Sequence, residues 1–432
     1  MRANRQAVFV GGNRCGVLTE DSHGSISFAY DRGYDGVPLS LSMPVGLARY
    51  GNRVVRPFLQ GLLPDEASTR ASIGARYGVS GENPFRLLGV VGMECPGAVQ
   101  VLEENAEPPA TDDTDGLVAL TDAEIEARLR EVKADMSSVW TDVDSSLGHW
   151  SLGGCQSKFA LREREGKWYA CSGSAATTHI LKPGVAGYEG QALVEYLSMR
   201  VARTIGLPVA DVEYRRFGSE HAIVIGRYDR VTMPDGTVRR IHQEDLCQAL
   251  GVPPQTKYAE QGGPTTSDIL RLMRMTGSNA RENAYRFILY LFFNYLIGAT
   301  DAHAKNHSLL HIAPGDMRLA PLYDVATIAA YESLAPRKRK PLRAALSIGG
   351  ENRFGMVGRE QVEKMVRDGN LDELGIGAGL LCERFELMVG MLPGAIAREA
   401  DAVESVEPAF RPLGQKIVNE VSANCRRSIE RL

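Results

Sequence analysis

Short apolar runs alternate with polar and glycine-containing stretches in the N-terminal part of the chain. The runs at 8–10, 16–18 and 26–28 are strand candidates, because glycine and polar turn residues separate them. Residues 1–103 are therefore expected to form a β-rich domain that includes a helical piece. The next segment, 104–116, is acidic and proline-rich and lacks an apolar period, so it predicts a linker.

Beyond this linker the apolar positions also show helical spacing. Thr121-Asp-Ala-Glu124 is a capping-box sequence and predicts a helix that runs to about Lys133. Apolar residues recur every four positions over 191–205, which predicts a second helix. Gly206-Leu-Pro208 then ends this helix. Short strands are expected on both sides of this helix, over residues 150–245. From residue 243 onward the pattern is mostly helical.

A strongly apolar run at 287–297 leads into a polar segment. The run is too short to cross a bilayer, which needs about 20 residues. It is followed by Asp301-Ala-His-Ala-Lys-Asn306 and later by Tyr323-Asp324-Val325. An aspartate and an asparagine five residues apart, followed by a second aspartate, are typical of a protein-kinase catalytic loop. The alternative is a polar loop after a core helix.

Two upstream features suit a phosphate site. Residues 151–158, Ser-Leu-Gly-Gly-Cys-Gln-Ser-Lys, form a glycine-rich turn whose backbone N–H groups can converge on an anion, although it is not a Walker sequence. Lys182 ends a short strand-like run before Pro183, where it can reach nucleotide phosphates. The alternatives are an ordinary turn and a surface lysine. Glycine-rich turn, lysine, Asp301-x4-Asn306 and a later aspartate nevertheless follow one another in kinase order.

Further segments in the same order resemble one known family. They are Phe58-Leu-Gln-Gly-Leu-Leu-Pro-Asp65, Gly97-Ala-Val-Gln100, Thr177-Thr-His-Ile-Leu-Lys-Pro183, Arg227-Tyr-Asp-Arg230, His242-Gln-Glu-Asp245, Gln248-Ala-Leu-Gly251, Lys257-Tyr258, Gly262-Gly-Pro264, Leu296-Ile-Gly298 and Pro321-Leu-Tyr-Asp-Val325. With these motifs the chain resembles the HipA family of serine/threonine kinases, the toxin half of bacterial toxin–antitoxin pairs. The resemblance spans nearly the whole sequence.

The resemblance implies an α+β fold with the two lobes of a HipA-like, protein-kinase-like protein. Its parts would be a β-rich N-terminal subdomain at 1–103, the linker at 104–116, a nucleotide-binding lobe at 117–242 and a helical lobe with the catalytic loop at 243–432. The implied cofactors are ATP and Mg²⁺.

Roles for individual residues follow from phosphoryl-transfer chemistry and from the resemblance. Asp301 is the candidate general base, since it comes first in the loop and needs only to reach the incoming hydroxyl. Asn306 and Asp324 are the candidate Mg²⁺ ligands, because this ion prefers hard oxygen donors. The candidate ATP-binding residues are Gly153, Gly154, Lys182, Tyr228, Gln243, Lys305 and Tyr323.

Other positions allow two interpretations. Lys305 either faces the γ-phosphate or is an exposed structural lysine, and Glu195 either pairs with Lys182 or faces solvent. Gly226 stands where relatives often carry a glutamate, so one side-chain contact to the nucleotide is expected to be lost. The basic cluster at 336–341 is either a solvated loop or a local contact with nucleic acid.

Ser151 stands at the mouth of the glycine-rich turn. In the resembling family a serine at this position is autophosphorylated, which expels the loop and inactivates the kinase. A phosphate adds about −1.5 to −2 charges, which should repel ATP. The alternative is that Ser151 only ends a turn.

Composition agrees with a folded protein of this kind. The chain has 432 residues, 44% of them hydrophobic and 24% charged, which permits a large core. A net charge of −4 gives no global attraction to nucleic acid. Seven cysteines show no CxxC pair, which indicates reduced thiols in a cytosol. No signal-peptide pattern is present, so a cytoplasmic location without membrane contact is expected.

Two functions of different class are consistent with the sequence. The first is an active kinase toxin of the persistence type, which arrests growth by phosphorylating a translation factor; aminoacyl-tRNA synthetases are the usual targets of the family. Its expected partner is a small helix-turn-helix antitoxin resembling HipB, which would bring it to operator DNA. The alternative is a catalytically weak co-repressor that acts by binding this antitoxin on DNA. The complete set Lys182, Asp301, Asn306 and Asp324 favours the kinase.

Overall fold

The computed structural model describes residues 4–107, 112, 114–134, 153–154, 156–185, 187–336 and 340–432. Contacts within the chain divide it into two compact units. The first comprises Met1–Ala186, Arg215–Gln255 and Ser308–Met317, and the second comprises Gly187–Tyr214, Thr256–His307 and Arg318–Leu432. Each unit is therefore built from three separate stretches of sequence.

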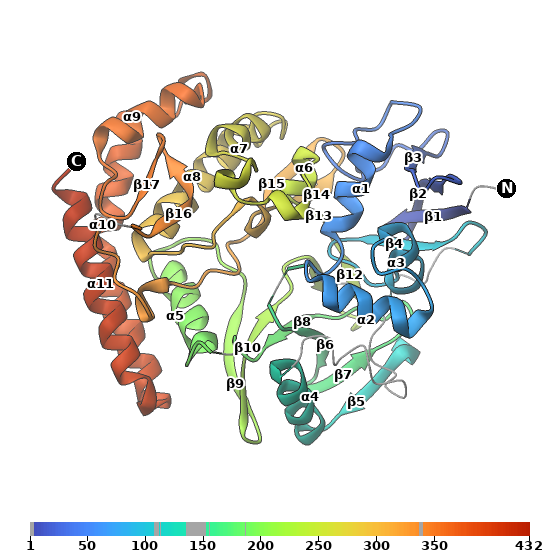
Figure 1. Cartoon of the computed structure of the whole chain (residues 1–432), viewed down its shortest axis with the longest axis horizontal. Helices are drawn as coiled ribbons and strands as arrows, with labels where there is room; N and C mark the ends of the chain where they lie inside the picture. Colours follow the sequence, from blue (N-terminus) through green and yellow to red (C-terminus); the bar gives the residue numbers. More distant parts are fainter. Residues whose placement is uncertain are drawn as a thin grey trace. The chain divides into compact units, whose positions relative to one another are not determined.

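The first unit begins with a four-stranded antiparallel sheet in the order β3-β2-β1-β4. Its strands are β1 (Asn4–Val10), β2 (Asn13–Glu20), β3 (Ile26–Tyr30) and β4 (Val99–Glu103). The three strands expected in the N-terminal part of the chain are confirmed. The expected helical piece consists of α1 (Asn52–Gly61), α2 (Ala67–Tyr77) and α3 (Pro84–Val91), which lie beside this sheet in Figure 1.

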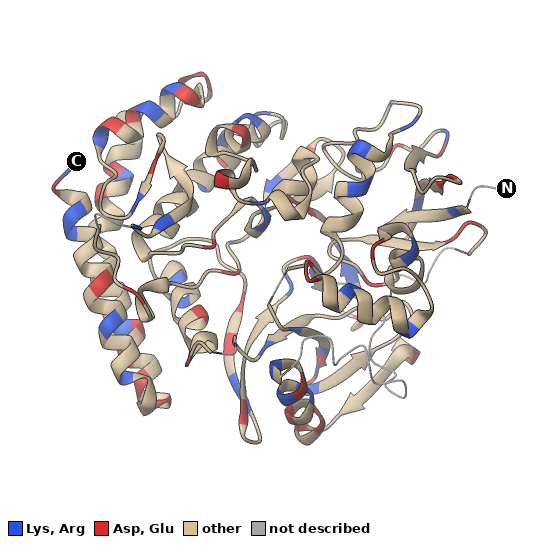
Figure 2. Cartoon of the chain, viewed as in Figure 1, with Lys and Arg blue, Asp and Glu red and all other residues tan. Residues whose placement is uncertain are grey.

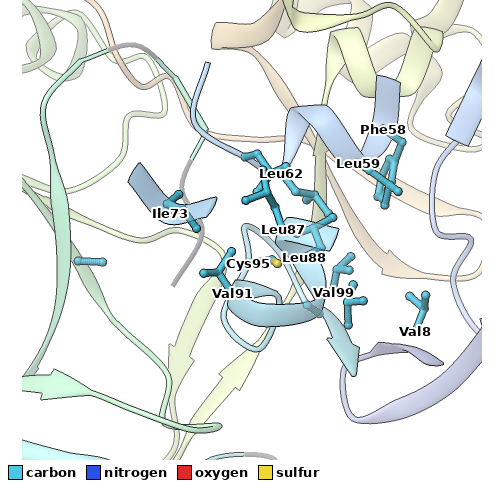
Figure 3. Close-up of a cluster of buried hydrophobic side chains, with 14 of the residues drawn as sticks. Val8, Phe58, Leu59, Leu62, Ile73, Leu87, Leu88, Val91, Cys95 and Val99 are labelled. Carbon is cyan, nitrogen blue, oxygen red and sulfur yellow. The ribbon is translucent and has the colours of Figure 1, made fainter. Parts of the chain in front are cut away.

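A buried hydrophobic cluster joins these helices to the sheet (Figure 3). It includes Val8, Phe58, Leu59, Leu62, Leu87, Leu88, Val91 and Val99, all of them buried. Fully burying a side chain of this size contributes roughly 1.5–3 kcal/mol, so the cluster holds the end of α1 firmly against the sheet. The segment that follows α1, Leu62 to Asp65, is thereby fixed as well.

The second sheet lies mainly in the first unit and has six strands in the order β5-β7-β6-β8-β10-β9. They are β5 (Leu117–Leu120), β6 (Phe159–Arg164), β7 (Lys167–Cys171), β8 (His179–Lys182), β9 (Val212–Phe217) and β10 (Glu220–Gly226). Helix α4 (Asp122–Ala134) packs on β10. Its predicted capping box is confirmed: Thr121 N–H donates to Glu124 Oε2 at 2.7 Å, and Glu124 N–H donates to Thr121 Oγ1 at 3.3 Å.

Short strands continue after β10, and from residue 242 onward they are more frequent than the sequence indicated. β11 (Arg230–Thr232) pairs with β12 (Val238–Arg240), and β13 (His242–Asp245), β14 (Ser308–Ala313) and β15 (Asp316–Leu319) form a three-stranded sheet. β16 (Arg343–Ile348) and β17 (Glu351–Arg353) form a hairpin. Strands of three to six residues are too short for an apolar period to stand out among the helices.

The second unit is mainly helical. Its helices are α5 (Gln191–Thr204), α7 (Thr266–Met273), α8 (Ala280–Ile297), α9 (Arg359–Asp368), α10 (Ala378–Val406) and α11 (Arg411–Ile429); the short α6 (Leu246–Leu250) belongs to the first unit. The helix predicted at 191–205 is confirmed as α5. Helices α10 and α11 pack along each other (Figure 1). The α+β fold class is therefore confirmed.

The surface of the described helices carries both signs of charge. Figure 2 shows Lys and Arg interspersed with Asp and Glu on α4, α9 and α11. Six described cysteines are buried and form no disulfide. Among the described residues, no helix is both long enough and apolar enough to span a membrane.

Candidate active site

The candidate catalytic loop begins where α8 ends. The C-terminal half of α8 is buried, and Gly298 takes the left-handed conformation, φ 80°, that ends the helix. A Cβ at Gly298 would lie 2.7 Å from the side chain of Leu334, so a larger residue does not fit there. The chain then leaves the core at Asp301 and forms a 3₁₀ turn at Ala304–Asn306.

Asp301 and Asn306 are brought together, as the loop pattern predicted. The Asn306 side-chain N–H donates to the main-chain carbonyl of Asp301 at 2.8 Å. This bond ties the amide nitrogen of Asn306 to the backbone, so the Oδ1 atom of Asn306 points away from the Asp301 carbonyl. The Asp301 side chain is 69% exposed, and its Oδ1 accepts a hydrogen bond from the Tyr258 hydroxyl.

His303 lies inside the loop and is buried. Neither of its ring nitrogens has a hydrogen-bond partner, and the Tyr258 ring packs edge-on against it with centroids 4.8 Å apart. Burial, assisted by the charge of Lys257, lowers the pKa of His303 to about 3. His303 is therefore neutral near pH 7 and serves as a packing residue.

Tyr323 and Asp324 continue the site in the same unit. The Tyr323 hydroxyl donates to the Lys305 carbonyl at 3.0 Å. Asp324 has a φ of 58°, a left-handed conformation that is uncommon for residues other than glycine and is often found at functional sites. Lys305 is buried, so its interpretation as an exposed structural lysine is wrong.

The oxygen donors of this unit fit Mg²⁺ in the presence of a nucleotide. Asn306 contributes an amide oxygen and Asp324 a carboxylate, which are the ligand types that Mg²⁺ prefers. No group of three or more His, Cys, Asp or Glu side chains among the described residues could hold a metal ion. A site with one carboxylate therefore needs phosphate oxygens and water to complete an octahedral shell, as Mg²⁺ sites commonly do.

Lys182 and the glycine-rich turn lie in the first unit. Lys182 is the last residue of β8, is buried, and stands opposite Ile223 of β10. Gly154 has a φ of 101°, and its carbonyl accepts the Asp65 N–H at 3.2 Å. A side chain at Gly154 would be strained, so the turn needs glycine there. Gly153 is also described, but Ser151 lies outside the described residues.

Tyr228 and Gln243, both predicted to bind ATP, contact each other. The Tyr228 hydroxyl donates to Gln243 Oε1 at 2.5 Å, and Gln243 Nε2 donates to Asp229 Oδ2 at 3.3 Å. The Gly97 N–H also donates to Asp229 Oδ2, at 2.7 Å. Gly226 ends β10 opposite His179, in ordinary strand pairing.

A buried ion network that the sequence analysis missed surrounds Asp229. Glu94 accepts hydrogen bonds from Arg227, Arg230 and Arg240 at 3.1, 2.9 and 2.6 Å, and the first two arginines also bind Asp229. Burial opposes the charge of Glu94, but Arg230, Arg240 and Arg227 outweigh it and hold the pKa of Glu94 well below its usual value. The network thus joins the N-terminal segment to β10–β12.

Two further expectations concern the surface. Glu195 is buried, so its interpretation as a solvent-facing residue is wrong, while its pairing with Lys182 stays a prediction. In the basic cluster at 336–341, residues 337–339 lie outside the described part of the chain.

Comparison with protein families identifies the chain. The family model of the HipA N-terminal domain matches residues 6–102, and that of the HipA-like C-terminal domain matches residues 150–375, more than half of the sequence. The chain belongs to the HipA family. The resemblance found in the sequence motifs is therefore confirmed.

Individual HipA-family relatives match almost end to end. The kinase-named protein Y4mE of Sinorhizobium fredii is 36% identical over 401 residues, covering 90% of this chain and 90% of its own. The serine/threonine-protein kinase toxin HipA of Shewanella oneidensis is 26% identical over 385 residues, covering 86% and 83%. A solved Shewanella oneidensis MR-1 complex of HipA, HipB and operator DNA matches with a TM-score of 0.81 at 23% identity, over 98% and 97% of the two chains. This last likeness confirms the fold.

Sequence reasoning about this HipA-family chain missed what Tyr258 and Glu94 contact. Lys257-Tyr258 was noted only as a motif, although Tyr258 binds Asp301 across 43 residues of sequence. Glu94 gave no periodic signal. A cue for it was available, since four arginines at 227, 230, 239 and 240 share a short stretch with only two acids, at 229 and 235. Any of these arginines that are buried therefore require further carboxylate partners.

Proposed function

We propose that this HipA-family protein is an ATP- and Mg²⁺-dependent serine/threonine protein kinase and the toxin of a toxin–antitoxin pair. The observation that carries the proposal is the geometry of the catalytic loop. Asp301 presents an exposed carboxylate, the Asn306 amide is tied to the backbone of Asp301, and Asp324 is held in a left-handed conformation. The name of the Shewanella relative, a serine/threonine-protein kinase toxin, supports the same activity.

The proton of the incoming serine or threonine hydroxyl passes to Asp301. A general base must come within hydrogen-bond reach of that proton, and the exposure of Asp301 allows a hydroxyl on another protein to approach it. Asn306 and Asp324 would hold Mg²⁺ through oxygen atoms. When bound, this ion neutralises charge that develops on the phosphate oxygens during transfer.

The remaining predicted residues bind the nucleotide. Lys182 contacts the phosphates, and the turn at Gly153 and Gly154 offers backbone N–H groups to them. Tyr228 and Gln243 are hydrogen-bonded to each other, so their side chains are held in place before the nucleotide binds. Lys305 and Tyr323 complete the proposed ATP-binding set.

Partners and substrate are proposed at the level of the family. A small helix-turn-helix antitoxin resembling HipB is the expected partner, and operator DNA is reached through it; the solved complex of HipA, HipB and operator DNA supports this assembly. The protein substrate is a translation factor, an aminoacyl-tRNA synthetase by resemblance. Autophosphorylation of Ser151 would place negative charge beside the phosphate site and switch the kinase off.

Phosphopeptide mass spectrometry tests this function. The wild-type chain and the Asp301→Asn variant are each produced in bacteria without any antitoxin, and phosphopeptides are compared. We expect new phosphoserine or phosphothreonine sites, including Ser151, only with the wild type. Identical phosphopeptides from both cultures would contradict the kinase assignment, and phosphorylated Ser151 in both would mean that another kinase modifies it.

A co-repressor without transfer chemistry is the second candidate. Gly226 favours it, because this residue offers no side-chain contact to a nucleotide. In that case the wild type and the Asp301→Asn variant would bind the antitoxin on operator DNA equally well, and neither culture would gain a phosphopeptide. The complete Lys182, Asp301, Asn306 and Asp324 set favours the kinase.

A further inference from the structure

We propose that Tyr258 is a positioning residue for Asp301, acting through the hydrogen bond from its phenol O–H to Asp301 Oδ1. The proposal rests on the proposed function, because it assigns Tyr258 a part in the same transfer step. Both residues belong to the second unit, and they are 43 positions apart in sequence.

The side chain of Asp301 needs a constraint that its backbone does not supply. Its main-chain carbonyl accepts hydrogen bonds from the N–H of His303 and the side chain of Asn306, both at 2.8 Å, so the backbone is held. The carboxylate itself is 69% exposed, and its terminal torsion has a broad, two-fold preference. A phenol bond to Oδ1 fixes this torsion and thereby holds Oδ2, the proposed acceptor of the hydroxyl proton, in one orientation.

The main chain of Tyr258 is itself firmly held. Its carbonyl accepts the N–H groups of Gln261 and Gly263, each at 3.0 Å, which closes a tight turn. A Cβ at Gly263 would overlap the Thr256 carbonyl oxygen and lie 2.8 Å from that of Tyr258, and Gly262 has a φ of 84°. The Gly262-Gly263 pair is therefore required for the turn that presents Tyr258.

The ring of Tyr258 is fixed on one side by the catalytic loop. It meets the His303 imidazole at an interplanar angle of 80°, an edge-on contact that aromatic rings prefer. His303 is buried in the loop two residues after Asp301. The same loop therefore orients both ends of the hydrogen bond, the phenol through His303 and the carboxylate through its own backbone.

The Tyr258→Phe variant removes the hydroxyl and keeps the ring contact. We expect it to lower kcat about tenfold, since a misplaced catalytic group is costly, while KM for ATP and the melting temperature stay unchanged. In an Asp301→Asn background the same change should cause no further loss. The matched control is Tyr331→Phe, which removes a hydroxyl bonded to the Glu189 carbonyl at 2.9 Å in the same unit and should leave kcat unchanged.

Two kinetic results would overturn the proposal. One is a Tyr258→Phe enzyme that transfers phosphate as fast as the wild type or faster. The other is a fall in kcat that is accompanied by a higher KM for ATP and a lower melting temperature, because that pattern indicates a merely structural role.

A spectroscopic measurement tests the hydrogen bond without catalysis. In full-length protein labelled with carbon-13 at the tyrosine ring carbon that bears the hydroxyl, the Tyr258 resonance is the one lost in Tyr258→Phe. It should shift in Asp301→Ala and stay in place in Tyr331→Phe. A resonance that does not move in Asp301→Ala overturns the proposal even if the wild type is an active kinase. A shifted resonance in a chain that transfers no phosphate overturns the proposed function and, with it, the role of Tyr258 in transfer.

Discussion

Asp324 combines a role that the sequence indicated with a conformation that it did not. Its position after the Asp301-x4-Asn306 pattern identified it as a candidate Mg²⁺ ligand, because ligand type and chain order are visible in the sequence. Its left-handed backbone was not predictable, since no periodicity encodes a single positive φ. Similarly, the bond between Asn306 and Asp301 was expected from close spacing, whereas Tyr258 lies too far away in sequence for spacing to reveal its contact.

Two substitutions at Asp324 should separate the effect of its charge on Mg-ATP binding from the effect of its left-handed backbone on stability. Asn tolerates the left-handed conformation, so Asp324→Asn should keep the melting temperature of the free protein while abolishing the rise caused by Mg-ATP. Asp324→Ala should abolish that rise and also destabilise the free protein by about 1 kcal/mol. Thermal unfolding with and without Mg-ATP measures both effects.

The control for Asp324 is an aspartate outside the site. Asp368→Asn removes a charge that pairs with Lys364 on the surface of α9, and it should leave the Mg-ATP effect intact. An undiminished thermal shift in Asp324→Asn would exclude Asp324 as a metal ligand.

At the scale of elements, the parts with local signals were predicted well. The capping box predicted α4, the four-residue apolar spacing predicted α5, and short apolar runs predicted β1 to β3. The strands after residue 243 were missed because they are short and gain their pairing from distant segments, as when β13 pairs with β14. The link between the N-terminal segment and β10–β12 through Glu94 is tertiary and leaves no local pattern.

Glu94→Gln should weaken this link strongly. It removes the carboxylate that pairs with three buried arginines, and breaking a buried charge pair typically costs about 3 kcal/mol or more. Urea unfolding at pH 7 measures the loss. The matched control is Glu383→Gln on the exposed face of α10, which should change the free energy of unfolding by less than about 0.5 kcal/mol.

The effect of Glu94 should depend on pH. Its folded-state pKa is depressed, so its charge stabilises the fold above the unfolded pKa of about 4.3 and stops doing so as the pH falls toward the folded value. The difference in stability between the wild type and Glu94→Gln should therefore shrink between about pH 5 and pH 3. A difference that stays constant over this range would show that Glu94 carries no stabilising charge.

At the scale of the whole molecule, the sequence predicted the α+β fold and the HipA family through many ordered motifs. It did not predict how the chain divides, because the two compact units are interleaved in sequence. Helix α5, assigned to the nucleotide lobe at 117–242, belongs to the second unit, where it contacts α10. Linear boundaries drawn from composition cannot anticipate such long-range contacts, and the proposed domain boundaries stay predictions.

Phosphate transfer by the purified full-length chain tests the central claim most directly. The wild type and Asp301→Asn are incubated with ATP labelled at the γ-phosphate, with Mg²⁺ or with a chelator, and protein-bound label is counted. The account predicts label in the wild type with Mg²⁺, on the chain itself or on added bacterial protein. It predicts a loss of at least about 100-fold in Asp301→Asn, the lower end of the range for a general base, and background label with the chelator. Equal labelling of both proteins, or no labelling of either, would contradict it.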